Sequence, residues 1–89
     1  MAGAMVNVRS PRGDVGVARL ADVSLHGCSL HIADSLLRVG GFVSIGIGGQ
    51  PQLQAIVRWI RDGMAGMEFL APIPAERTEW HELMNRMPL

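Results

Sequence analysis

Asp22, Ser24 and Gly27 combine residue types and a spacing that suit ligand binding. Asp22 and Ser24 are two residues apart, so both side chains leave the same face of an extended chain. A carboxylate accepts hydrogen bonds, a hydroxyl donates or accepts one, and a glycine lets a ligand come close to the backbone. The same two side chains can instead bond backbone N–H groups of their own turn. The residues alone therefore leave a binding role and a structural role open.

Two strands joined by a tight turn must position these residues. Residues 15–24 alternate as a half-buried strand does, and residues 28–32 alternate again. Leu20 and Asp22 fall on one face of the first strand, and its other face carries Val15, Val17, Arg19 and Ala21. We expect Gly27 to adopt the positive φ that a sharp reversal requires.

Four more strands are predicted from alternation and from the turn formers between them. They span residues 5–9, 42–47, 53–61 and 64–69, and residues 33–41 form a connector with a helical turn at 35–38. The strand over 53–61 is apolar on both faces: Leu53, Ala55, Val57 and Trp59 share one, and Ile56 and Ile60 lie on the other. Asp62-Gly63 is a strong signal for a hairpin.

The end of the chain changes its period. Four apolar residues fall at i, i+3, i+4 and i+7, as on one stripe of an amphipathic helix: Trp80, Leu83, Met84 and Met87. We expect the stripe to pack on the strands rather than on a partner. The sequence thus predicts an all-β fold in a single domain of residues 1–89. It is a small six-stranded antiparallel β-barrel over about 5–70, followed by one C-terminal α-helix over about 74–86.

The composition argues against several functions. The formal net charge is zero and the chain has no Tyr, which disfavours binding to a nucleic acid polymer or to an anionic membrane. No apolar run approaches the length of a membrane span and no secretory pattern is present, so a cytoplasmic location is expected. The single cysteine, Cys28, alternates with core residues and is expected to be a small core side chain.

No residue set for catalysis is found. Ser24 has no base placed to activate it, and the three histidines, His26, His31 and His81, are scattered along the sequence. We therefore predict a protein that is not an enzyme and that has no metal site and no cofactor.

Three segments together resemble the PilZ domain family. Asp22-Val-Ser-Leu-His-Gly27 resembles its D-x-S-x-x-G motif, and residues 40–47 resemble its G-x-x-V-x-I strand. Residues 57–60 and 65–69 resemble its closing hairpin, V-x-W-V followed by G-V-x-F. The resemblance implies a six-stranded barrel with a C-terminal helix, a role in bacterial cyclic di-GMP signalling, and contacts from Asp22, Ser24 and Gly27 to a guanine and its phosphate.

The sequence departs from the family's R-x-x-x-R motif, whose arginines hold the phosphates. Upstream of the hairpin lie only Arg9, Arg12 and Arg19, and Arg12 precedes Asp22 by ten residues. Arg9 and Arg12 are thus expected at the end of the first strand and in its turn, and Arg12 or Arg19 is the candidate substitute. We predict weak direct binding of cyclic di-GMP. The alternative is a nucleotide-independent PilZ-like adaptor with a protein partner; the sequence leaves homo-oligomerisation open.

Overall fold

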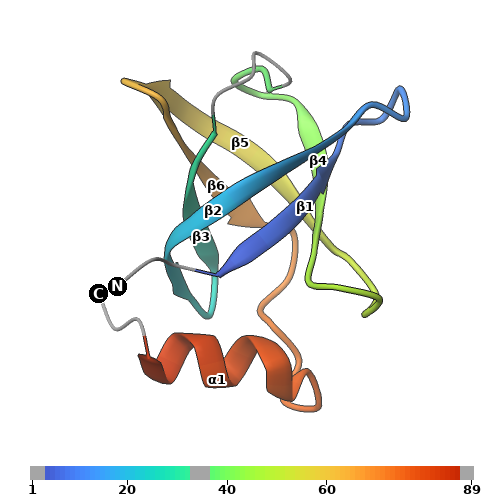
Figure 1. Cartoon of the computed structure of the whole chain (residues 1–89), viewed down its shortest axis with the longest axis vertical. Helices are drawn as coiled ribbons and strands as arrows, with labels where there is room; N and C mark the ends of the chain where they lie inside the picture. The colour runs from blue at the N-terminus through green and yellow to red at the C-terminus, as the bar shows by residue number, and fades with distance from the viewer. Residues whose placement is uncertain (1–3, 33–36, 87–89) are drawn as a thin grey trace.

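The protein is a closed antiparallel β-barrel with one helix across its end (Figure 1). The computed structural model describes residues 4–32 and 37–86. The strands are β1 (Met5–Arg9), β2 (Val15–Ser24), β3 (Gly27–His31), β4 (Phe42–Gly46), β5 (Leu53–Arg61) and β6 (Met64–Phe69). Their order around the barrel is β1-β2-β3-β6-β5-β4, and β4 pairs with β1 to close it. The predicted fold class is confirmed.

Short turns of distinct chemistry join the strands. Asp62 and Gly63 both have positive φ, 53° and 76°, so they connect β5 to β6 in the way that suits the twist of a two-residue hairpin. Gly13, with a φ of 94°, completes the turn between β1 and β2. Of the residues predicted to form a helical turn in the connector, 35 and 36 lie outside the described residues, and Leu37 and Arg38 are not helical.

Gly27 does not have the positive φ that the sequence predicted. It is the first residue of β3 and pairs with Ser24, while Leu25 and His26 form the turn. The reason for a glycine is steric, because a Cβ atom at Gly27 would clash with the carbonyl oxygen of Met67 on β6. The residue therefore permits close packing of two strands and does not reverse the chain.

We expect Gly27→Ala to lower the free energy of unfolding by roughly 1–3 kcal/mol, the usual effect of overpacking against atoms that cannot yield. Gly49→Ala is the matched control, because a Cβ atom there meets open space. Urea denaturation of both variants checks the prediction. Equal midpoints for the two variants would contradict it.

Two β-bulges change which side chains face the core. On β2, Leu20 pairs with Leu30 and Asp22 with Ser29, so Ala21 is an extra residue; on β5, Arg58 is extra in the same way. Asp22 therefore lies on the face opposite Leu20, and Trp59 on the face opposite Val57, whereas the sequence predicted a shared face in each case. Val23 and Val57 remain buried, and Trp59 is 36% exposed.

The helix α1 (Thr78–Arg86) lies across the end of the barrel nearest the β2–β3 turn (Figure 1). It begins four residues later than predicted, because residues 74–77 form a separate turn in which the N–H of Arg77 bonds the carbonyl of Pro74. Trp80 is fully buried and Leu83 is buried, so the predicted packing on the barrel is confirmed for both; Met87 lies outside the described residues. The Trp80 ring meets Phe69 edge to face, with centroids 6.0 Å apart. In the described ranges no helix has the length and apolar character needed to span a membrane.

Candidate functional site

A hollow of about 390 Å³ runs over the outer face of four neighbouring strands, β2, β3, β6 and β5. We call it the outer groove. Two rows of paired residues cross it from β2 to β5: Asp22–Ser29–Gly66–Trp59 and Ser24–Gly27–Glu68–Ile56. Its floor contains Gly27, Ser29 and Gly66, whose side chains are small or absent. The hollow thus arises because small residues on β3 and β6 lie between larger ones on the two bulged strands.

The three residues of the predicted hairpin site all line the outer groove. The bulge at Ala21 places Asp22 and Ser24 together on the outer face, with Val23 buried between them. The Ser24 hydroxyl donates a hydrogen bond to the carbonyl oxygen of Gly27 at 3.4 Å, so this serine stabilises its own turn. Within residues 4–32 and 37–86 the Asp22 carboxylate has no hydrogen-bond partner, which leaves its oxygens available to a ligand.

The opposite side of the groove is formed by Arg58, Trp59 and Glu68, which the sequence did not predict as site residues. The Trp59 indole lies against Gly66, where a Cβ atom would clash with the ring. The Arg61 guanidinium lies over the same ring, 5.1 Å from its centroid. Arg58 Nε donates to Glu68 Oε1 at 2.8 Å. Arg58 and Trp59 both face the groove because Arg58 is the extra residue of the β5 bulge, and Glu68 faces it because β6 pairs with β3.

Ser29 is an unsatisfied polar group in the floor of the groove. Alternation places it on the outer face, yet its side chain is only 7% exposed. Its hydroxyl oxygen is buried and has no hydrogen-bond partner among the described residues. A buried hydroxyl without a partner is unfavourable, so this position combines a small side chain with an unused donor and acceptor.

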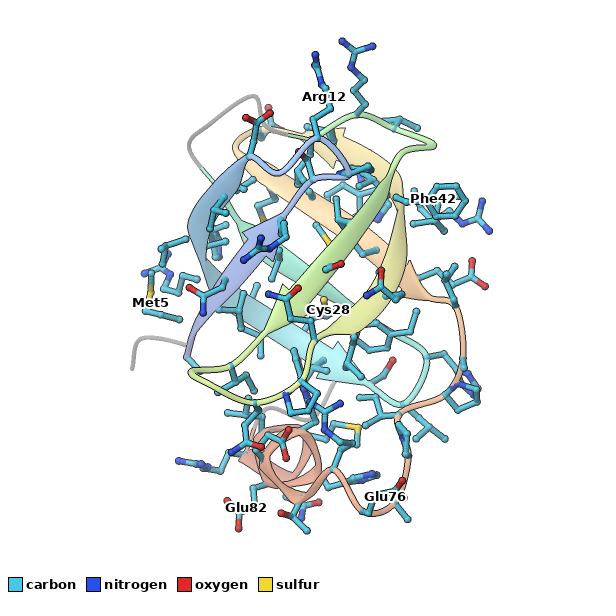
Figure 2. The ribbon with its side chains drawn as sticks, turned by 90° about the vertical axis from the view of Figure 1, so that its right-hand side faces the viewer. Met5, Arg12, Cys28, Phe42, Glu76 and Glu82 are labelled. Carbon is cyan, nitrogen blue, oxygen red and sulfur yellow. The ribbon has the colours of Figure 1, made fainter. Side chains whose placement is uncertain are left out.

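Cys28 lies beside these residues in sequence but inside the barrel, where Figure 2 shows its sulfur. Burial, and to a smaller extent the charge of Asp22, raises the pKa of the Cys28 thiol from about 9 to about 12. The thiol is therefore protonated and inert at neutral pH, in agreement with the core role predicted for it. In the described part of the chain, no three His, Cys, Asp or Glu side chains gather in a way that could hold a metal ion.

The predicted substitute arginines do not join the hairpin residues in one hollow. Arg9 ends β1 and Arg12 lies in the turn that follows, as predicted. Arg12 is at the end of the barrel away from α1 (Figure 2), where it lines a second hollow with Arg38 and Phe42. Asp22 lies seven residues beyond Val15 along β2, a span of roughly 23 Å, which is too far for Arg12 to bridge. Arg19 is exposed on the outer face of β2, before the bulge, and does not line the groove.

The strand order and the C-terminal helix define a small closed barrel with the hairpin residues on its outer face. A family model for the PilZ domain matches residues 3–86. The chain belongs to the PilZ domain family, as its motifs predicted, and is a module of the kind associated with cyclic di-GMP signalling. A comparison with curated proteins found no match.

Proposed function

We propose that the outer groove is a low-affinity site for cyclic di-GMP and that it binds the nucleotide through one guanine. The observation that carries this proposal is the Asp22 carboxylate, which lines the groove without a hydrogen-bond partner among the described residues. Guanine presents two adjacent N–H donors on one edge, and a carboxylate with two free oxygens can accept from both. Family membership supports this choice of ligand.

The remaining groove residues suit the rest of a guanosine. Trp59 is 36% exposed on the opposite side, and its ring offers a sequence-tolerant surface on which a base stacks once it displaces the Arg61 guanidinium. Gly27 and Ser29 carry no large side chain that would block the floor beside Asp22, whereas the Trp59 indole occupies the space over Gly66. The volume of about 390 Å³ falls within the range of roughly 300–1,000 Å³ that small-molecule sites occupy.

The charges of the groove argue for weak binding. Its lining contains two carboxylates, Asp22 and Glu68, and one guanidinium, Arg58, which is already paired. The formal charge of the lining is therefore one negative unit, and cyclic di-GMP has two phosphate charges. A hydrogen bond to a charged group contributes about 1.5–3 kcal/mol. The absence of two arginine contacts in the groove lowers the affinity by roughly 100- to 10,000-fold relative to a site that has them.

We expect a protein of this sequence to bind cyclic di-GMP with a dissociation constant above the micromolar range in isothermal titration calorimetry, and Asp22→Asn to bind more weakly still. Arg12→Ala is the matched control, because Arg12 lies in the second hollow at the far end of the barrel. Equal affinity of Asp22→Asn and the unaltered protein would overturn the assignment of the groove. Micromolar or tighter binding that is lost in Arg12→Ala would show that Arg12 substitutes for the phosphate-holding arginines of the R-x-x-x-R motif.

A protein-binding adaptor is the second candidate, and exposed apolar side chains favour it. Phe42 on β4 is 55% exposed and projects from the barrel in Figure 2, and its strand partner Ile56 is partly exposed. Ile60, further along β5, is 44% exposed. Binding that stays undetectable at millimolar cyclic di-GMP would favour this adaptor role over the nucleotide site.

A further inference from the structure

The one cation in the outer groove is held by a neighbouring anion. Arg58 and Glu68 form an ion pair at 2.8 Å, and their side chains are 56% and 55% exposed. Exposed pairs of this kind contribute little to the stability of a fold. The pair therefore matters in the groove, where, among the residues that the structure describes, Arg58 is the only guanidinium in the lining and Glu68 is one of two carboxylates.

The position of the pair is set by the fold. Glu68 is the strand partner of Gly27 on one side and of Ile56 on the other, so it stands directly beside the D-x-S-x-x-G hairpin. Arg58 is the extra residue of the β5 bulge and adjoins Trp59, on whose ring we place the base. A guanidinium at this place can bond a phosphate, but its Nε and its charge are already engaged by the Glu68 carboxylate.

We propose that Arg58 is the phosphate-binding residue of this groove and that Glu68 competes with the phosphate for it. The inference rests on the proposed function, namely that the groove binds a guanine nucleotide. On binding, one phosphate oxygen replaces the Glu68 carboxylate as the partner of Arg58, and the carboxylate turns to solvent. Because one anion replaces another on Arg58, the exchange adds little to the free energy of nucleotide binding. Glu68 thereby keeps the affinity for the nucleotide low.

Removal of the Glu68 charge tests the competition. Glu68→Gln keeps the shape of the side chain and an amide oxygen for Arg58, but it removes the strong acceptor and the like charge facing the phosphate. We expect this variant to bind cyclic di-GMP roughly 3- to 20-fold more tightly, the range for loss of one exposed ion pair and one nearby like charge. This gain in affinity becomes smaller as the sodium chloride concentration is raised, because salt screens the charges.

The experiment is a double-mutant cycle by isothermal titration with cyclic di-GMP, at low and high salt. The four proteins are the unaltered chain, Glu68→Gln, Arg58→Ala, and the variant with both changes; their melting temperatures verify that each is folded. The proposal predicts that the gain from Glu68→Gln disappears when Arg58 is Ala. Equal affinities of Glu68→Gln and the unaltered chain, or an equal gain with and without Arg58, would overturn it.

The Asp22→Asn variant separates this inference from the function on which it rests. If cyclic di-GMP binds in an Asp22-dependent way and Glu68→Gln has no effect, the competition is wrong and the groove assignment stands. If none of the proteins binds, Glu68→Gln included, the proposed function fails and the competition fails with it.

Discussion

Trp80→Ala is expected to lower the free energy of unfolding by roughly 3–5 kcal/mol. Trp80 is the largest fully buried side chain, and its ring joins α1 to Phe69 at the end of β6. Its indole nitrogen has no hydrogen-bond partner among the described residues, so the loss comes from packing and not from a lost bond. The total free energy of unfolding of a small folded protein is roughly 5–15 kcal/mol, so Trp80→Ala removes a large share of the stability.

Urea denaturation followed by circular dichroism measures this loss, and two variants interpret it. Trp80→Phe keeps an aromatic ring at this position, so it should lower the free energy of unfolding much less than Trp80→Ala does. Trp59→Ala removes a half-exposed indole on the outer face and should lose less than Trp80→Ala. A Trp80→Ala protein as stable as the original, but altered in its association by size-exclusion chromatography, would show that the helix stripe is a partner surface after all.

Alkaline pH is expected to destabilise the protein through one thiol. In the unfolded chain Cys28 loses its proton near pH 9, whereas burial raises its folded pKa to about 12. Between these values the folded state binds one proton more than the unfolded state, so the free energy of unfolding falls as pH rises. The limiting slope is about 1.4 kcal/mol per pH unit, which amounts to roughly 2 kcal/mol from pH 9 to pH 11.

The composition makes this measurement unusually direct. All eight basic residues are Arg and the chain has no Tyr, so Cys28 is the one side chain that titrates in this window. Denaturant midpoints at pH 8, 9, 10 and 11 give the slope, and Cys28→Ala should abolish it. A flat profile in the unaltered protein would mean that the thiol is hydrated in the folded state.

Strand positions could be predicted from the sequence, and strand faces only in part. Alternation and turn formers located all six strands, because both signals are local. The bulges at Ala21 and Arg58 could not be predicted, because an extra residue in one strand leaves no mark in its composition. Each bulge inverts the alternation beyond it, which is why Asp22 and Trp59 lie on faces other than those predicted. The start of the helix was wrong because Pro74–Arg77 satisfies its own turn.

Half of the candidate site was visible in the sequence. Asp22, Ser24 and Gly27 are close along the chain and match a family motif, so local reading found them. Arg58, Trp59 and Glu68 lie more than thirty residues later and reach the groove only because β6 pairs with β3. No local sequence pattern predicts that β3 and β6 pair with each other. The role of Gly27 was also misjudged, since the Met67 carbonyl that crowds it belongs to β6.

The claim that the outer groove is the nucleotide site is tested most directly by NMR mapping with cyclic di-GMP. The probes are the backbone amides and the two tryptophan indole N–H groups of the isotope-labelled protein. We expect concentration-dependent shifts at Ser24, Gly27, Gly66 and the Trp59 indole, and none at Trp80, which is buried between α1 and the barrel. Shifts gathered instead at Arg12, Arg38 and Phe42, around the second hollow, would contradict it.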